Sequence, residues 1–155
     1  MKNKLSELSQ KFSRAVIKPV MFMSVAGIII SFAALFKLEV MPTFIQQIGD
    51  FMFNLLTNAV IGQFALIFSV GISTALVKKN KTNVAIIGVM SFMIFLYANN
   101  SWLTITNRLA EAGEHGLLGT GQNIVLGIQV TDMGVFSGIV IGCITGYIFN
   151  KFGSK

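Results

Sequence analysis

The sequence predicts an all-α membrane protein with about four transmembrane helices and one or two amphipathic interfacial helices. Apolar residues make up 54% of its 155 residues, charged residues only 12%, and the mean hydropathy is +0.74. A soluble domain carries about 25% charged residues, and half of that proportion cannot cover a globule of this size with solvated surface. The same balance excludes intrinsic disorder, which needs low hydrophobicity and high net charge.

Three stretches are free of charge and long enough to span a bilayer, namely residues 19–36, 59–77 and 133–149. Eighteen helical residues measure about 27 Å, close to the ~30 Å hydrocarbon core. A fourth apolar stretch, 84–98, is shorter and reaches a full span when it is extended to 84–101, with Trp102 at the interface. A buried or re-entrant segment is the alternative for this stretch.

Basic residues alternate between the segments that connect these spans. Ten of the twelve Lys and Arg residues fall in 1–18, 78–81 and the tail 150–155, whereas 37–58 and 99–132 are net negative. This alternation follows the positive-inside rule. It predicts a multi-pass membrane protein with both termini in the cytoplasm, and the Lys78, Lys79 and Lys81 cluster is then a topogenic charge. A cleaved signal peptide is disfavoured because the first apolar run exceeds a typical h-region and three more spans follow.

Two further segments have an amphipathic pattern. Residues 1–18 place Leu5, Leu8, Phe12 and Ala15 on one helical face, which predicts a cytoplasmic helix lying on anionic membrane lipids. A solvated, partly ordered tail is the alternative. Residues 43–58 repeat apolar side chains at helical spacing. They predict a helix that lies in the outer interface or packs against the spans, and that runs on into 59–77 with a bend at an undefined position.

The loop 99–132 has local patterns of its own. Trp102, Ile105 and Leu109 suggest a short helix that ends near Gly113, and 123–130 alternates weakly, as an extended segment does. Gly116–Gly121 is a turn region rather than a phosphate loop, because no Lys-Ser/Thr pair follows it. His115, also in this loop, is expected to be exposed to solvent.

The last span carries the most specific local signal. Gly134, Gly138, Gly142 and Gly146 recur every four residues and form a strip without side chains, which predicts close helix–helix packing. The predicted partner is a second copy of the chain or a missing C-terminal half. Just before this span, Thr131 and Asp132 are suited to capping its first N–H groups; the alternative is that Asp132 binds an ion or a sugar.

The sequence offers no catalytic, cofactor-binding or metal-binding set. It holds one Cys and one His, so neither a disulfide nor a Cys/His metal cluster can form within the chain. The spans contain no Asp, Glu, Lys, Arg or His, which argues against a proton-driven pump. Cys143 is interpreted as a small packing residue. Gln63 is the best candidate for contact with a polar solute, although the substrate-binding residues stay unknown.

Three blocks resemble one transporter family, in the same order along the chain. Residues 11–20 read KFSRAVIKPV, 64–79 read FALIFSVGISTALVKK, and 132–142 read DMGVFSGIVIG, with NKF at 150–152. They resemble the opening, the second span and the "GVFGGIIVG … NKF" stretch of enzyme IIC, the membrane component of the sugar phosphotransferase system (PTS). The similarity is greatest to the glucose superfamily, on its α-glucoside or maltose-like side.

The resemblance implies a sugar permease of the bacterial cytoplasmic (inner) membrane, whose substrate is phosphorylated by a partner enzyme IIB. It also implies that residues 19–149 are a partial enzyme IIC membrane domain, because the first half of family members is a scaffold and dimer-forming region. No position here matches the family's sugar-binding motif, so a truncated or split enzyme IIC is expected.

Two other classes of protein are alternatives to a permease. A self-standing four-helix membrane protein, either a small channel or an interaction subunit, is the main alternative. A soluble nucleic-acid binder would suit the net charge of +6 but not the apolar composition, so nucleic acid is not an expected partner.

Overall fold

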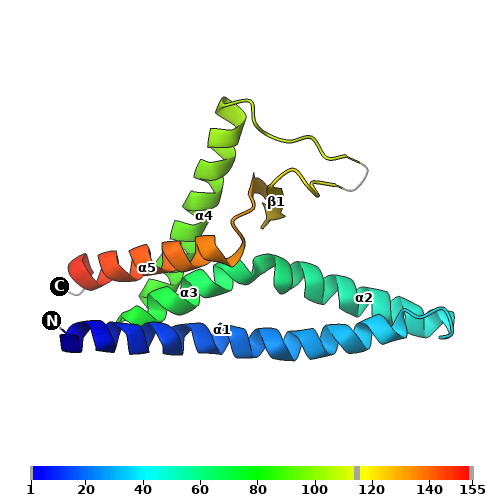
Figure 1. Cartoon of the computed structure of the whole chain (residues 1–155), viewed down its shortest axis with the longest axis horizontal. Helices are drawn as coiled ribbons and strands as arrows, with labels where there is room; N and C mark the ends of the chain where they lie inside the picture. Colours follow the sequence, from blue (N-terminus) through cyan, green and yellow to red (C-terminus); the bar gives the residue numbers. More distant parts are fainter. Residues whose placement is uncertain (1, 114–115, 154–155) are drawn as a thin grey trace.

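The computed structural model describes residues 2–113 and 116–153, with the side chains of all of these except residues 2–5, 8 and 18. Over these residues the chain is mostly helical, with one small β-hairpin (Figure 1). The elements in chain order are α1 (Lys2–Phe36), α2 (Thr43–Ala59), the 3-10 turn η1 (Ile61–Gln63), α3 (Phe64–Leu76), α4 (Lys81–Ile105), β1 (Gln122–Val125), β2 (Ile128–Thr131) and α5 (Gly134–Phe152). Four helical stretches of the described chain are long and apolar enough to cross a membrane: Ser9–Phe36, Thr43–Leu76, Lys81–Ile105 and Gly134–Phe152. The predicted fold class is therefore confirmed.

α1 joins the expected basic segment 1–18 and the expected span 19–36 into one helix of 35 residues. At about 1.5 Å per residue it measures roughly 52 Å, far more than the ~30 Å hydrocarbon core. Part of α1 must therefore lie outside that core or run along its boundary.

α2 turns back and packs against the second half of α1 (Figure 1). The contact is close because Gly49 has no side chain: a Cβ there would lie 2.8 Å from the Phe36 Cβ and 3.0 Å from the Ala33 carbonyl oxygen. Lys37, in the connecting turn, forms an ion pair of 3.1 Å with Asp50. Of the two placements that the sequence left open for 43–58, packing against a span is the one observed.

The bend that the sequence could not locate lies between α2 and α3. α2 ends at Ala59, Val60 has φ −103° and ψ −65°, and η1 follows at Ile61–Gln63 before the α-helix resumes. A short 3-10 segment that contains a glycine, Gly62, breaks the regular hydrogen-bond ladder and redirects a helix. The 34 residues Thr43–Leu76 thus form one apolar stretch with two differently directed helices.

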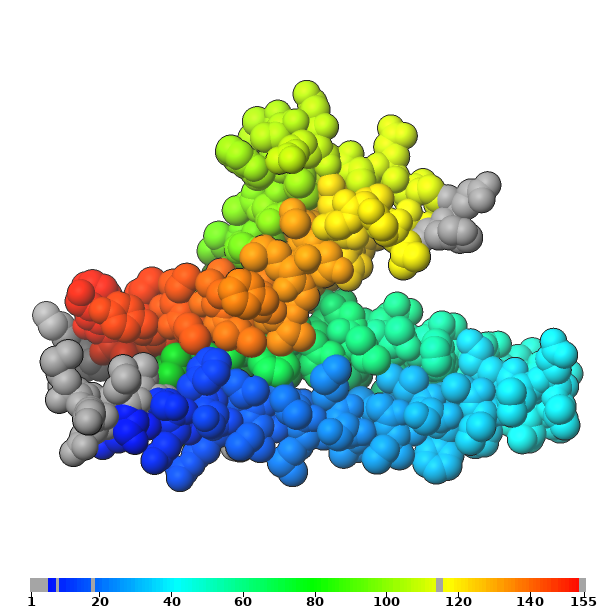
Figure 2. Space-filling model, in the orientation of Figure 1, coloured from blue at the N-terminus to red at the C-terminus, as the bar shows by residue number. Residues whose placement is uncertain are grey.

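α3 is the central element, because it contacts α1, α4 and α5. It has only 13 residues, yet six of them are buried: Phe64, Ala65, Phe68, Ser69, Ile72 and Ser73. The last turns of α4 and the loop that follows stand away from α1 and α2, as the space-filling view shows (Figure 2).

The outer loop differs from its prediction in one respect. The expected short helix over Trp102, Ile105 and Leu109 does not exist as a separate element, because α4 continues through Trp102 and ends at Ile105. Asn107 then adopts φ 52°, a left-handed conformation that ends helices and that Asn tolerates. Leu109 lies beyond that point. The expected extended segment is present as β1 and β2.

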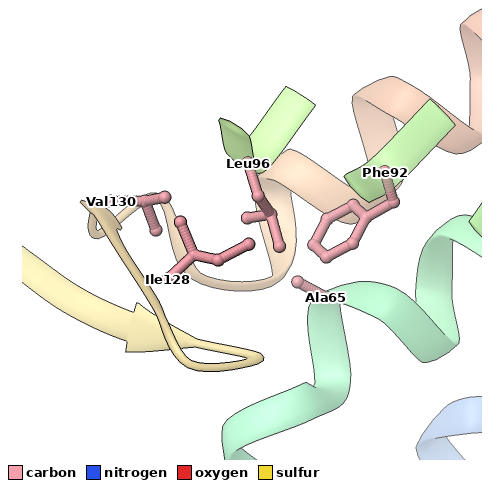
Figure 3. Close-up of a cluster of buried hydrophobic side chains, with 5 residues drawn as sticks. All are labelled: Ala65, Phe92, Leu96, Ile128 and Val130. Carbon is pink, nitrogen blue, oxygen red and sulfur yellow. The ribbon is translucent and has the colours of Figure 1, made fainter. Parts of the chain in front are cut away.

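β1 and β2 form an antiparallel hairpin, closed by the pair Val125 and Ile128. The two turn residues, Leu126 and Gly127, have φ 51° and 79°, the pattern of a type I′ turn. Ile128 and Val130 are buried against Phe92 and Leu96 of α4 and Ala65 of α3, as Figure 3 shows. The hairpin is therefore part of the packed structure.

Candidate functional site

The contact between α3 and α5 is the tightest helix–helix contact of the described chain. A Cβ on Gly138 would overlap the carbonyl oxygen of Ala65, and one on Gly142 would lie 2.8 Å from that of Ser69. One turn further, a Cβ on Gly146 would lie 3.0 Å from the side chain of Leu76. Three glycines spaced by four residues therefore bring the two backbones into direct contact.

The glycine strip was correctly predicted as a packing surface, but its partner and its extent were not. The strip packs on α3 of the same chain, and Gly138, Gly142 and Gly146 are buried there, so it is not open to a second copy. Gly134 does not belong to it, because a Cβ there would meet no atom within 4 Å. Gly134 instead begins α5 with φ 51°, a conformation that L side chains rarely adopt.

Small residues also mediate the contact between α3 and α4. Gly88 leaves room for Ser73, whose Oγ would lie only 2.7 Å from a Cβ at that position. The Ser69 hydroxyl donates a long hydrogen bond of 3.5 Å to the Gly88 carbonyl. Both serine side chains are fully buried, and Ser73 donates to the Val70 carbonyl of its own helix at 3.1 Å. α3 thus satisfies its hydroxyls with main-chain carbonyls, as a helix shielded from water must.

The third face of α3 approaches α1 through Gly71 and Pro19. A Cβ on Gly71 would lie 3.4 Å from the Pro19 ring and 3.9 Å from the Ala15 carbonyl oxygen. Pro19 has no N–H to donate to that carbonyl, so α1 lacks one hydrogen bond here. Gly49, Gly71 and Gly88 were not singled out from the sequence, because single glycines in apolar helices give no periodic signal.

Side-chain amides attach the outer hairpin to the end of α4. Asn100 Nδ2 donates to the Gln129 carbonyl at 2.7 Å, and Asn99 Oδ1 accepts from the Thr131 N–H at 2.9 Å. Gln129 Nε2 in turn donates to Gln122 Oε1 at 2.9 Å and to the Ala110 carbonyl at 2.7 Å. This amide network fixes a loop that has little apolar core of its own.

Gln63, the residue expected to be best placed for a polar solute, contacts the main chain at both ends of its amide. Its Oε1 accepts from the Leu126 N–H at 3.2 Å, and its Nε2 donates to the Asn58 carbonyl at 3.4 Å. The side chain thus ties the tip of the hairpin to the α2–α3 bend, which is a positioning role.

The other residues noted in the sequence have simple places in the structure. Asp132 Oδ1 accepts from the Gly134 N–H at 3.0 Å, as a capping carboxylate does at a helix start. The Thr131 side chain makes no such bond to α5 among the described residues. Cys143 is half-buried against the apolar cluster around Phe68, in agreement with a packing role. His115 lies outside the described residues.

The two ends of the chain and the turn between α3 and α4 lie at one end of the structure (Figure 1). Asn150 Nδ2 of α5 donates to the Leu76 carbonyl at 3.3 Å, and Lys81 lines the same groove as Lys11 and Arg14 of α1. The basic residues Lys78, Lys79 and Lys151 belong to the same region by sequence. Positive charge is therefore collected at one end of the helices.

Four helical stretches of the described chain have the length and apolar composition to cross a membrane, and α1, α4 and α5 pack around α3. These features define an integral membrane protein built for helix packing. The chain belongs to the phosphotransferase system EIIC family, whose sequence model matches residues 13–154. The family assignment that rested on three short blocks is thereby confirmed.

Curated relatives carry the same family name. The chain is 25% identical to the maltose-specific PTS EIICB component of Bacillus subtilis, over 94% of this chain and 29% of that protein. It is 25% identical to the maltose-specific EIICB component of Escherichia coli, over 96% of this chain and 29% of that protein. It is also 26% identical to the glucose-specific EIICBA component of Staphylococcus carnosus, over 92% and 21% respectively. The chain thus spans less than a third of the length of these relatives.

Proposed function

We propose that this chain provides the membrane scaffold of a sugar permease of the phosphotransferase system, in the bacterial cytoplasmic membrane. The observation that carries the proposal is the family match over residues 13–154, together with four helical stretches of membrane length in the same residues. Sugar crosses through the enzyme IIC unit and is phosphorylated on the inner side by enzyme IIB. The relatives named as EIICB and EIICBA components support that partner.

The role assigned to residues 19–149 is structural, as part of an enzyme IIC membrane domain. The tight packing of α5, α4 and α1 around α3 supports this role, since it produces a rigid unit held by backbone contacts. No residue of the sequence matches the family's sugar-binding motif, so the groups that hold the sugar are assigned to residues outside it. α2 presents Phe44 and Phe51, which are 72% and 67% exposed, to lipid or to a second copy in a homodimer.

Both termini are assigned to the cytoplasm, with residues 150–155 as a short tail. The collection of basic residues near Lys11, Lys81 and Lys151 supports this orientation by the positive-inside rule. Single cysteines at Lys78 and Glu111, introduced into a Cys143→Ser background, test it in intact cells. A membrane-impermeant thiol reagent should label the cysteine at 111 but not that at 78. The reverse pattern would overturn the orientation.

Sugar uptake tests the scaffold role. The chain is expressed in a host without glucose and maltose permeases, alone and then with the neighbouring downstream reading frame. We expect no uptake by the chain alone, and uptake of maltose or glucose when the downstream frame supplies the sugar-binding groups. Uptake by the chain alone would contradict the scaffold assignment. Absence of uptake with a downstream frame that encodes no further spans would favour the self-standing four-helix protein.

A further inference from the structure

A groove of about 890 Å³ lies between α1, α3 and α4 at the basic end of the structure. α3 forms its floor, because α3 contacts both α1 and α4. The floor residues are Leu66, Ile67, Val70, Gly71, Thr74 and Ala75, and the apolar wall residues are Ala15, Pro19, Phe22 and Val89. Apolar side chains thus cover most of a concave surface that opens to the outside of the helices.

Three cations line one end of this groove: Lys11 and Arg14 from α1, and Lys81, the first residue of α4. Among the residues that the structure describes, no acidic one lines the groove. Among the side chains that the structure describes, the one ion pair joins Lys37 and Asp50, so none of the three groove cations has a carboxylate partner. The groove therefore combines unneutralised positive charge at its mouth with an apolar interior.

The apolar part extends away from the cations for a distance that matches a membrane leaflet. Val89 follows Lys81 by eight residues along α4, which is about 12 Å of helix. Half of the ~30 Å hydrocarbon core is about 15 Å. Thr74, the polar side chain on the floor, already donates to the Val70 carbonyl at 2.8 Å and to that of Gly71 at 3.0 Å. Its hydroxyl proton is therefore not available to a sugar or a peptide.

We propose that this groove binds an anionic glycerophospholipid, with its phosphate at Lys11, Arg14 and Lys81 and one acyl chain along α3. The inference rests on the membrane placement and orientation in the proposed function, and it assigns one defined lipid position to the inner leaflet. Charge selects an anionic head group, and the apolar floor selects an acyl chain over a soluble anion. The bound lipid would cover the face of α3 that lies between α1 and α4.

The test is native mass spectrometry of the full chain in detergent, titrated with palmitoyl-oleoyl phosphatidylglycerol or with the matched phosphatidylcholine. We expect one phosphatidylglycerol molecule to bind more tightly than phosphatidylcholine. The variant Lys11→Gln/Arg14→Gln/Lys81→Gln should bind phosphatidylglycerol roughly a hundredfold more weakly, since each basic residue near an anionic lipid contributes about a fivefold factor. The control Lys78→Gln/Lys79→Gln/Lys151→Gln removes equal charge outside the groove and should bind as the parent does.

Two further measurements separate the possible outcomes. Val89→Trp keeps all cations but fills the apolar end, and should also weaken binding of phosphatidylglycerol. An excess of glycerol 3-phosphate should not displace the lipid. Equal weakening in both triple variants would show a diffuse charge effect. Unchanged binding in Val89→Trp would exclude the acyl-chain site, and displacement by glycerol 3-phosphate would show a site for soluble anions. Each of these results overturns the proposal. Circular dichroism confirms that the variants keep their helix content. Lipid binding is measured without sugar uptake, so the proposed function can fail while the groove assignment stands.

Discussion

Replacement of Gly138 by alanine should destabilise the helix assembly more than any other single methyl group added to the glycine strip. The new Cβ would overlap the Ala65 carbonyl oxygen and would lie 2.7 Å from the carbonyl carbon and 2.9 Å from the Cα. Ordinary contact begins at 3.4 Å, and every obstructing atom belongs to the main chain. Relief therefore requires α5 to move away from α3 by at least several tenths of an ångström, and no side-chain rotation can replace that movement.

The cost follows from this displacement. Overpacking of a close-packed contact costs about 1–3 kcal/mol, and a gap of 0.5–1 Å forfeits about a quarter to a half of each dispersion contact along the strip. Alanine recovers about 0.5–1 kcal/mol of helix propensity. The net expectation is a loss of about 1–3 kcal/mol in the free energy of unfolding. Gly27→Ala is the matched control, because a Cβ there meets nothing within 4 Å, and it should stabilise α1 by about 0.5–1 kcal/mol.

Unfolding in mixed micelles, followed by circular dichroism during titration with a denaturing detergent, measures both variants. Gly146→Ala provides an intermediate case, because its Cβ would lie 3.0 Å from the Leu76 side chain and 3.2 Å from the Ser73 carbonyl oxygen, farther than the obstructing atoms at Gly138. We expect the order of stability Gly27→Ala, Gly146→Ala, Gly138→Ala, from highest to lowest. A Gly138→Ala protein as stable as the Gly27→Ala protein would refute the backbone contact between α3 and α5.

Three other perturbations have defined expectations. Gly88→Ala should lower the free energy of unfolding by about 1–3 kcal/mol, because its Cβ would lie 2.7 Å from Ser73 Oγ. In the same detergent titration, Ser73→Ala added to Gly88→Ala should largely restore stability, and additive losses in the double variant would exclude the contact. Asn100→Ala removes the 2.7 Å hydrogen bond to the hairpin and should lower the free energy of unfolding by about 1 kcal/mol. Proteolysis between residues 106 and 133 should become faster, and an unchanged cleavage rate would show that the amide does not hold the loop. Asp50→Ala should change stability by less than about 1 kcal/mol, because its ion pair with Lys37 is solvent-exposed, and a larger loss in detergent titration would point to a role beyond the pair.

The sequence was informative where a pattern repeats. The spans follow from long runs without charge, and the packing face of α5 follows from Gly138, Gly142 and Gly146 at a spacing of four. The identity of the neighbour does not follow, because a strip without side chains accepts any helix with small residues. α3 presents Ala65 and Ser69 to it, yet small residues in an apolar helix look the same whether they face lipid or protein.

Other features escaped prediction for a similar reason. The bend before α3 depends on Gly62 within three residues of 3-10 geometry, which is too short to alter a hydropathy pattern. The hairpin is held by amides from Asn99, Asn100 and Gln129, and such bonds depend on tertiary proximity. Gln63 stands out in the sequence as a polar residue within an apolar run, but only the fold shows that the Leu126 N–H is its partner.

The central position of α3 has a consequence for synthesis of the protein. α3 ends at Leu76, and α5, which covers its Ala65 and Ser69 surface, ends 76 residues later at Phe152. At about 5–20 residues per second, the ribosome needs roughly 4–15 s to add that length. During that interval the Ala65 and Ser69 surface of α3 lacks the glycine strip of α5 that covers it. The translocon or an insertase therefore has to hold the incomplete helix bundle until α5 is inserted.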